Sequence, residues 1–545
     1  IEFYFDEYLR GENGWSIIRK DGRKEKYPRI GMPKKSPKNG NDVYLTINIQ
    51  IQRIVENILD QTVKQFKAKC GMCIIMDPVN GDILAMASKP DFNPNAWQLY
   101  DASHRKNRCI SYNFEPGSTF KVITAAAMLQ ENLLQENDSI DGNKGVYKIY
   151  NQVIRDHKKY ENITFAEALY YSSNVCFAKM VDKLGNKRFY NYIKDFGFGT
   201  RSGICLPGEE DGIVHPISRW SGRTRVTMAI GQEISTTLLQ MLIVYSAIAN
   251  GGVLIEPRIY TKIVDSEGSI IQYQKLKMKR RVLSEDVADR LRDMLRGVVE
   301  NGTAKKSVLP GLSIGGKTGT SQKIEKDTKR YSRKKVWASF IGFLPVDNPV
   351  FVCGILIDEP AYGDYGGTVA CPAFKEIVQQ IISHPNLRYT KKLIGKNFLD
   401  SLNCIIVNRT NRSKEVPDMY GMDREQARMF LSSEGLTFEI IGTGKTIIYQ
   451  NPSAGSKFFL DTKLLLFTDE FIEKENHNNN KLLTAQVQVP NCIGKDLKDA
   501  INTLNLKGLV PYIDGSGIVR NQIPSYGTKR SIIVPCTLIC SFDDG

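Results

Sequence analysis

The chain has 545 residues, of which 41% are hydrophobic and 24% are charged. These fractions are ordinary for folded protein and exclude a disordered or fibrous chain, and the length predicts three or four domains. The formal net charge of +15 fits either a soluble basic surface or attraction to an anionic polymer or membrane. The nearest approach to a membrane-spanning run, residues 241–255, is interrupted by Asn250, Gly251 and Gly252, so no span is expected within this sequence.

Neither a nucleic-acid partner nor a metal centre is indicated by the residue pattern. The densest basic run, residues 326–335, contains six Lys or Arg but only Tyr331 as an aromatic, which argues against nucleic-acid binding. Of 11 cysteines only Cys70 and Cys73 are closely spaced, and the five histidines are far apart. Without a second C-x-x-C, this pair predicts a structural role in a buried strand at 70–76, and no metal or cofactor is implied.

In chain order, residues 1–50 are interpreted as the remnant of a further domain, joined to the next block by a helix from about Ile49 to Phe66. Residues 51–385 form a large block in which helix and strand signals are mixed, which predicts an α+β multidomain protein. A basic, polar stretch at 386–413 is expected to be a linker.

The C-terminal third contains an internal repeat. The segment 416–421, Val-Pro-Asp-Met-Tyr-Gly, recurs at 489–494 as Val-Pro-Asn-Cys-Ile-Gly, and further matches continue in register. This indicates two copies of one small α+β module, at 414–471 and 487–545, with a polar linker at 472–486. Helices are predicted at 423–434 and 496–507, and strands at 446–449, 463–468 and 531–542.

The first chemical motif lies at residues 116–121, which read Pro-Gly-Ser-Thr-Phe-Lys and contain S-x-x-K. Pro-Gly marks the start of a helix, and the apolar run 122–133 predicts that helix. Ser118 and Lys121 are three residues apart and share one helix face. A serine nucleophile needs a base, and Lys121 can act as one only if burial or a second cation lowers its pKa. The alternative is that Ser118 is simply a helix N-cap.

Two further motifs occur later in the chain. Residues 172–174 read Ser-Ser-Asn, an S-x-N pattern placed on a turn after a helix predicted at 164–171. Ser172 could relay a proton, and Asn174 could offer its amide to a substrate carbonyl. Residues 315–320 read Gly-Gly-Lys-Thr-Gly-Thr and contain K-T-G.

The K-T-G motif is expected to begin an edge strand, because its glycines leave room for a substrate backbone to lie alongside. Lys317 and the hydroxyls of Thr318 and Thr320 can bind a carboxylate, and Lys317 is also a candidate for the second cation near the S-x-x-K lysine. Strands predicted at 336–344 and 350–357 continue an antiparallel sheet, after a long basic loop expected at 323–335.

No single motif is decisive. Ser103 to Lys106 and Ser332 to Lys335 also match S-x-x-K, and Ser401 to Asn403 matches S-x-N. The interpretation depends on three motifs that occur in order, each in a suitable local context.

Together the motifs resemble those of the penicillin-recognising serine enzymes, and more specifically of class B penicillin-binding proteins. Residues 112–118, 229–232 and 340–343 resemble further segments of that family, and the repeated modules resemble PASTA domains. The resemblance implies a transpeptidase domain at 51–385, in which helices flank an antiparallel sheet. It also implies that residues 1–50 are the end of an N-terminal pedestal.

The resemblance further implies a D,D-transpeptidase that cross-links peptidoglycan stem peptides ending in D-Ala-D-Ala through an acyl-enzyme on Ser118. Lys121 would be the general base and Ser172 the proton relay. The oxyanion hole would be the backbone N–H groups of Ser118 and Thr320. The implied substrate-binding residues are Asn174, Lys317, Thr318, Gly319 and Thr320.

The same resemblance implies ligands, partners and a location. The ligands would be stem peptides on lipid-linked or nascent glycan strands and β-lactam antibiotics, and the partners would be division proteins. The chain would act in septal wall synthesis at the extracytoplasmic face of the bacterial membrane, held by an N-terminal helix missing from this sequence. A β-lactamase-like hydrolase and a non-catalytic PASTA wall sensor are the alternatives, and the PASTA modules either bind wall fragments or pack against the catalytic domain.

Overall fold

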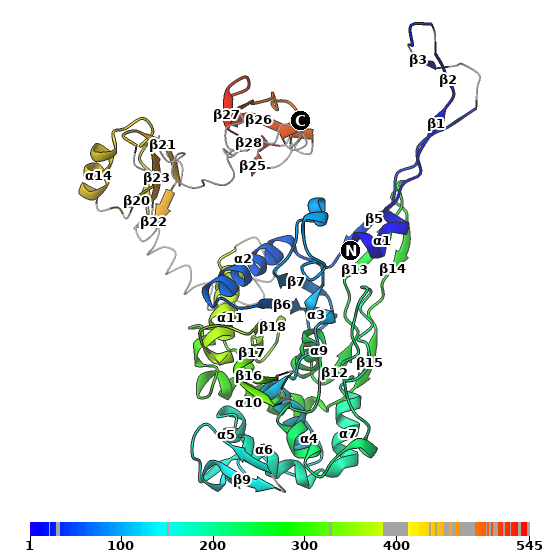
Figure 1. Ribbon diagram of the computed structural model, residues 1–545, viewed down its shortest axis with the longest axis vertical. Helices are drawn as coiled ribbons and strands as arrows, with labels where there is room; N and C mark the ends of the chain where they lie inside the picture. Colours follow the sequence, from blue (N-terminus) through cyan, green and yellow to red (C-terminus); the bar gives the residue numbers. More distant parts are fainter. Residues whose placement is uncertain are drawn as a thin grey trace. The chain divides into compact units, whose positions relative to one another are not determined.

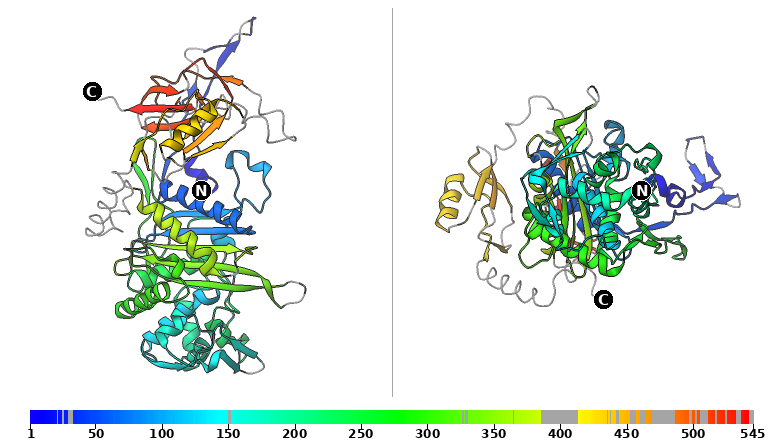
Figure 2. Two further views of the ribbon diagram at one scale, coloured as in Figure 1. Left: turned by 90° about the vertical axis from the view of Figure 1, so that its left-hand side faces the viewer. Right: turned by 90° about the horizontal axis from the view of Figure 1, so that it is seen from below.

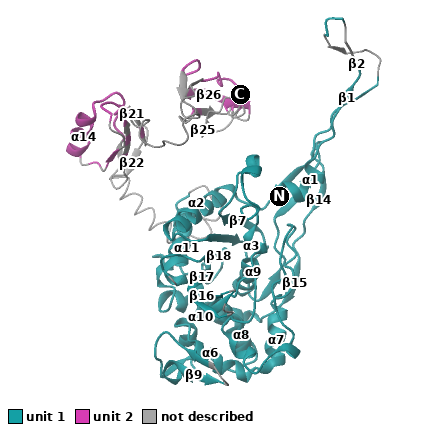
Figure 3. Ribbon diagram, viewed as in Figure 1, with its two compact units in different colours: residues 1–400 teal, residues 401–545 magenta. Residues whose placement is uncertain are grey.

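The chain forms two compact units, residues 1–400 and 401–545 (Figure 3). The computed structural model describes most of the first unit and parts of the second. The described residues are 1–20, 22–24, 26–28, 33–149, 152–325, 327, 330–363, 365–384, 413–434, 436, 438–441, 444–451, 457–459, 464–468, 486–496, 499–500, 503–504, 511–515, 518–523, 525–531 and 536–541.

A five-stranded antiparallel sheet lies at the centre of the first unit (Figure 1). Its strand order is β16-β17-β18-β6-β7. In that order the strands span Gly315–Ile324, Tyr331–Leu344, Phe351–Asp358, Cys70–Met76 and Ile83–Lys89. Every residue of β6 and β18 is buried, which explains their unbroken apolar runs and confirms the buried strand expected at 70–76.

Helices cover both faces of this sheet. On one face lie α2 (Ile49–Gln65) and α11 (Gly366–Ile382), and on the other lies α9 (Leu238–Ala249) (Figures 1 and 2). A side chain on Gly71 would meet leucine and valine side chains of α2, whereas one on Gly354 would meet two leucines of α9. Each glycine therefore lets a helix approach its own face of the sheet. All of α9 is buried, which accounts for its uninterrupted apolar sequence.

Smaller helices and hairpins complete the first unit. Four helices surround the three motifs: α4 (Lys121–Gln130), α5 (Phe165–Tyr170), α6 (Asn174–Met180) and α10 (Glu285–Glu300). The other helices are α3 (Arg108–Ser111), α7 (Gly185–Asp195) and α8 (Thr224–Ala229). Two-stranded pairs are formed by β8 (Ser139–Asp141) with β11 (Asn162–Thr164), β9 (Val146–Ile149) with β10 (Gln152–Arg155), and β12 (Val253–Ile255) with β15 (Met278–Arg281).

The N-terminal segment pairs with a later part of the chain. Strand β5 (Asp42–Leu45) lies beside β13 (Tyr260–Val264), which also pairs with β14 (Ile270–Tyr273). Helix α1 (Glu2–Leu9) contacts β5, and its one buried side chain, Phe5, packs edge-on against the ring of Tyr260. Before β5 the chain forms short strand pairs, β1 (Trp15–Ser16) with β4 (Lys34–Lys35) and β2 (Ile18–Lys20) with β3 (Lys26–Pro28). Strand β5 therefore shares a sheet with residues far along the sequence.

The basic loop expected at 323–335 is mostly a β-hairpin. Strand β16 continues to Ile324 and β17 begins at Tyr331, so the expected strand start at 336 is wrong. Lys323 shows why the pairing extends, because its amine lies 2.7 Å from the fully buried Asp358 and 2.6 Å from Glu359. A buried carboxylate requires such a partner, and this pair ties the end of β16 to β18 across β17.

The second unit contains the repeated module. In the first copy α14 (Arg424–Ser433) begins after Asp423, whose carboxylate accepts two backbone N–H bonds, which confirms the expected helix. Strands of this copy have the order β20-β23-β21 and span Phe438–Ile441, Leu464–Thr468 and Ile447–Asn451. Strands β19 (Ser413–Glu415) and β22 (Lys457–Phe459) form a separate pair.

The second copy has the same strand arrangement. Its order is β25-β28-β26, spanning Pro511–Gly515, Cys536–Ser541 and Ile518–Ile523, and in both copies the central strand has one parallel and one antiparallel neighbour. The single strand expected at 531–542 is two strands, because β27 (Lys529–Ser531) pairs with β24 (Gln486–Gln488) before β28 begins. Most of the helix expected at 496–507 and nearly all of the linkers expected at 386–413 and 472–486 lie outside the described residues.

One side-chain bond is repeated in both copies. The amide oxygen of Gln450 accepts from the backbone of Met419 at 2.6 Å, and that of Gln522 accepts from the backbone of Cys492 at the same distance. Each glutamine also donates to the carbonyl of the proline that starts its module. The internal repeat in the sequence is therefore a repeat of structure.

In the described part of the chain, no helix has both the length and the apolar character to cross a bilayer.

Gly319 allows two motif-bearing elements to touch. A side-chain carbon at this position of β16 would lie 2.9 Å from the methyl group of Thr119 and 3.0 Å from the carbonyl oxygen of Pro116, and it would also collide with the hydroxyl of Ser339. Such distances are shorter than van der Waals contact, so only glycine fits here without displacing the strand.

We expect Gly319→Ala to lower the free energy of unfolding by about 1–3 kcal/mol, because the added methyl group overpacks a closed interface. The measurement is the midpoint of the first urea-induced unfolding transition of the whole chain. Gly22→Ala is the matched control, since a side chain there would meet nothing within 4 Å. Equal midpoints for the two variants would contradict the expectation.

Candidate active site

Ser118 lies on a short helical turn that is held from two sides. This turn, η2 (Gly117–Phe120), leads directly into α4. The backbone N–H of Gly117 donates to Gly231 at 3.0 Å, and the hydroxyl of the buried Tyr245 donates to the carbonyl of Thr119 at 2.9 Å. Gly117 has a φ of +54°, a conformation that glycine adopts without strain.

The N-cap alternative for Ser118 is wrong. The N-cap positions of η2 and α4 are occupied by Pro116 and Phe120, and neither cap involves a side-chain hydrogen bond. The half-buried Ser118 therefore has no capping role in either helix, and its hydroxyl is available for chemistry.

Lys121 connects the S-x-x-K motif to the S-x-N motif. Its side chain is fully buried. The amine lies 2.6 Å from the carbonyl oxygen of Ser172, 3.1 Å from the Ser172 hydroxyl and 2.7 Å from the side-chain oxygen of Asn174. Three acceptors thus surround an amine that has no access to water. Two motifs that are well separated along the chain therefore form one cluster.

Burial lowers the pKa of Lys121 to about 7, although the nearby Asp156 and Cys176 oppose this shift. Lys317 is also fully buried, and its pKa is lowered well below the usual value, first by burial and then by the charge of Lys121. Burial is the main cause of the lowered pKa of Lys121, and Lys317 is close enough to interact with it. Each ammonium group disfavours the charged form of the other, so the two lysines titrate as a pair.

Ser172 and Ser173 lie on the turn between α5 and α6, and Asn174 is the first residue of α6. The expected interhelical turn is therefore confirmed for the two serines. Ser172 has a φ of +60°, and this left-handed conformation turns the chain sharply between the two helices. The hydroxyl of Ser173 caps α6 by accepting from the backbone of Cys176 at 3.1 Å. The amide nitrogen of Asn174 donates to the carbonyl of Arg155 at 3.0 Å, and its second N–H remains available to a ligand.

The K-T-G residues lie on β16, an edge strand of the sheet, as expected. Strand alternation places Lys317 and Gly319 on one face and Thr318 and Thr320 on the other. The Thr320 hydroxyl accepts from the backbone N–H of Gly366 at 3.1 Å, which leaves its own O–H free to donate. A side chain on Gly117 would lie 3.1 Å from the carbonyl oxygen of Thr320, so this strand runs directly beside the Ser118 turn.

Two residues that the sequence interpretation missed connect the motifs. Thr303 donates its backbone N–H to Tyr170 at 3.2 Å, and its hydroxyl lies 2.7 Å from that of Thr318. Asp156 accepts hydrogen bonds from the S-x-N turn. No local pattern marks either residue, because each acts through neighbours that are distant in sequence.

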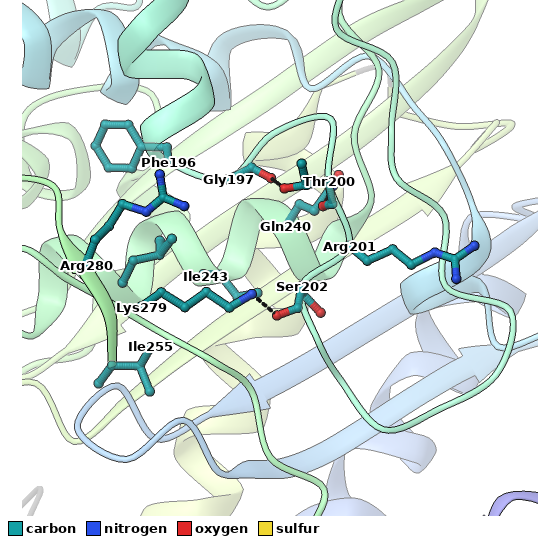
Figure 4. Close-up of a pocket in the computed structure, with 11 residues that line it drawn as sticks. Phe196, Gly197, Thr200, Arg201, Ser202, Gln240, Ile243, Ile255, Lys279 and Arg280 are labelled. Atoms are coloured by element: carbon teal, nitrogen blue, oxygen red, sulfur yellow. Dashed lines mark hydrogen bonds between the residues drawn. The ribbon is translucent and has the colours of Figure 1, made fainter. Parts of the chain in front are cut away.

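The pocket drawn in Figure 4 is separate from this cluster. It lies between the end of α7, α9, β12 and β15, and none of the predicted site residues lines it. Its three cations already have partners. Lys279 donates to the Ser202 carbonyl, and Arg280 and Arg201 lie 3.4 Å and 3.2 Å from aspartate carboxylates.

Among the described residues, no group of three or more His, Cys, Asp or Glu side chains could hold a metal ion.

Comparison with protein families gives two matches. Residues 71–379 match the penicillin binding protein transpeptidase domain, and residues 414–470 and 487–532 match the PASTA domain. The first match covers more than half of the chain and includes all three motifs.

Two relatives match at similar identity. Over 482 residues the chain is 33% identical to the stage V sporulation protein D of Bacillus subtilis, a match that covers 87% of this chain and 72% of that protein. It is 31% identical over 396 residues to the probable peptidoglycan D,D-transpeptidase PenA of Neisseria meningitidis, a match that covers 72% of this chain and 66% of the relative.

Solved structures show the same fold. Penicillin-binding protein 3 of Mycobacterium tuberculosis in complex with aztreonam has 32% identity and a TM-score of 0.61, over 66% of this chain and 82% of that one. Penicillin-binding protein 2X of Streptococcus thermophilus is only 21% identical but has a TM-score of 0.62 over 99% of this chain and 78% of its own. The motifs, the fold and the relatives agree, and the chain belongs to the class B penicillin-binding proteins, with a transpeptidase domain followed by PASTA domains.

Proposed function

We propose that this chain is a peptidoglycan D,D-transpeptidase that forms an acyl-enzyme on Ser118. The observation that carries the proposal is the buried Lys121 amine, which lies one helical turn after Ser118 and bonds to Ser172 and Asn174. A buried amine with a pKa of about 7 can accept a proton at neutral pH. The relatives named as D,D-transpeptidases support the substrate class.

In the proposed reaction Ser118 attacks the carbonyl of the penultimate D-Ala of a stem peptide. Lys121 takes the hydroxyl proton, and the backbone N–H groups of Ser118 and Thr320 stabilise the oxyanion of the tetrahedral intermediate. Ser172, in contact with the Lys121 amine, passes the proton to the departing D-Ala nitrogen. An amine from a second stem then attacks the ester and loses a proton to Lys121. Lys121 returns this proton to the Ser118 oxygen as the ester C–O bond breaks and the cross-linked peptide is released.

The substrate would lie along the edge strand β16. The hydroxyls of Thr318 and Thr320 and the amine of Lys317 would donate to the terminal carboxylate of the donor stem, while Gly319 lets this strand lie close to the Ser118 turn. Asn174 would donate its free N–H to the substrate amide carbonyl. None of these roles requires a metal or cofactor.

The proposal also covers the inhibitors of the enzyme and its location in the cell. β-Lactams would acylate Ser118 as substrate mimics, and the structures of M. tuberculosis penicillin-binding protein 3 with aztreonam and with ampicillin support this. The enzyme would act at the extracytoplasmic face of the bacterial membrane, anchored at its N-terminal side, in septal wall synthesis with division proteins. The PASTA domains would lie on the same side, within reach of the wall.

Penicillin is expected to add one covalent adduct to the wild-type chain and none to Ser118→Ala, because Ser118 is the proposed nucleophile and its hydroxyl is removed in the variant. Intact mass, followed over hours, is the measurement. Ser103→Ala is the matched control, since Ser103 begins a second S-x-x-K pattern but is exposed. An adduct that clears within seconds would indicate a β-lactamase, and no adduct at all would support a non-catalytic wall sensor.

The acylation rate is expected to rise with pH through a midpoint near the Lys121 pKa of about 7. Below that pH the amine holds a proton and cannot take one from Ser118. Stopped-flow reaction with a fluorescent penicillin between about pH 5 and about pH 9 measures the profile, and circular dichroism at each pH checks that the fold is unchanged. A rate that is flat across this range would exclude Lys121 as the base.

A further inference from the structure

A carboxylate lies directly behind the S-x-N turn. Asp156 comes immediately after β10, where its backbone N–H donates to Gly145 at 3.0 Å. One carboxylate oxygen accepts from the Ser173 hydroxyl at 2.6 Å, and the other accepts from the backbone N–H groups of Asn174 at 2.5 Å and Val175 at 3.1 Å. These bonds hold the start of α6 and fix the backbone that carries the turn.

The hairpin that carries Asp156 holds the turn at further points. The carbonyl of Arg155 accepts from the Asn174 side chain at 3.0 Å, so adjacent hairpin residues fix both the backbone and the amide of Asn174. Further along the same loop, the ring of Tyr160 stacks on that of Tyr171, with centroids 5.5 Å apart. The position of the S-x-N turn therefore depends on this hairpin.

The Asp156 carboxylate also affects the pKa of the buried Lys121 amine. Asp156 interacts electrostatically with Lys121 from α4, Cys176 from α6 and Tyr160 from the hairpin loop. Lys317 from β16 interacts in turn with Lys121. Burial raises the pKa of both Cys176 and Tyr160, so both are neutral near pH 7. The Asp156 carboxylate favours the protonated form of Lys121 and so opposes the effect of burial.

We propose that Asp156 is a positioning residue for the transpeptidase reaction, which fixes the Ser172–Ser173–Asn174 turn against Lys121 and supplies the negative charge that the buried amine faces. This inference rests on the proposed function, because it assigns Asp156 a part in setting the pH at which Lys121 becomes a base. Without the carboxylate, less would oppose the effect of burial on the amine, which would lose its proton at a lower pH.

The test compares substitutions that separate charge from geometry. Asp156→Asn removes the charge but keeps oxygen and nitrogen atoms that can bond to the turn. We expect the midpoint of its acylation profile to fall by ~0.5–1 pH unit. Asp156→Glu keeps the charge and lengthens the side chain, so its midpoint should stay while its acylation rate drops about tenfold. Asp141→Asn is the control, because Asp141 bonds to Lys179 instead and should leave the profile unchanged.

A second measurement does not require acylation. NMR of 13C-labelled lysine, assigned with Lys121→Met, follows the titration of the amine itself, and Asp156→Asn should lower that midpoint too. Unchanged or raised midpoints in Asp156→Asn, or a loss of rate that is equal at every pH, would overturn the inference. A wild-type chain that is not acylated, but whose Lys121 titration still shifts in Asp156→Asn, would overturn the proposed function and leave the role of Asp156 standing.

Discussion

The rest of the site is organised around the burial of the Lys121 amine. An ammonium group without water loses most of its solvation, so it must be surrounded by acceptors or give up its proton. The fold does both, since oxygens of Ser172 and Asn174 contact the amine and its pKa is brought to about 7. The same arrangement that makes burial tolerable therefore produces a base at neutral pH.

Because the acceptors come from the S-x-N turn, that turn cannot move without exposing the amine or leaving it unpaired. Neighbouring elements hold it in place: Asp156 from the hairpin, and Thr303 through the end of α5. Thr303 also contacts Thr318 on the edge strand. Displacements of about 1 Å can cost two orders of magnitude in rate, so these contacts outside the motifs matter as much as the motifs.

The two PASTA modules are very small folds, so the question for them is what stabilises each one. Each has a limited core, such as Ala427, Leu431 and Leu466 in the first copy, and modules of this size bury little apolar surface. The repeated glutamine bond adds a contact inside each module, since Gln450 and its counterpart Gln522 join a strand to the segment that precedes the helix. A buried amide that both accepts and donates a hydrogen bond helps to fix one arrangement of the chain without a large core.

The local features could be predicted from the sequence alone. Ser118 at a helical turn, the S-x-N turn after a helix, the edge strand at Lys317 and the repeat all come from short-range patterns of apolar, glycine and capping residues, which depend on neighbouring residues only. The extent of the hairpin at 323–335 could not be predicted in this way, because its pairing is stabilised by Asp358, a residue in another strand.

How the motifs meet is a property of the tertiary structure. Lys121 bonds to the S-x-N turn, the two buried lysines repel each other, and β5 shares a sheet with β13. The contributions of Asp156 and Thr303 likewise became visible only in the folded chain. All of these effects depend on distance and burial between segments far apart in the chain, and neither quantity is encoded in the spacing of residues along a sequence.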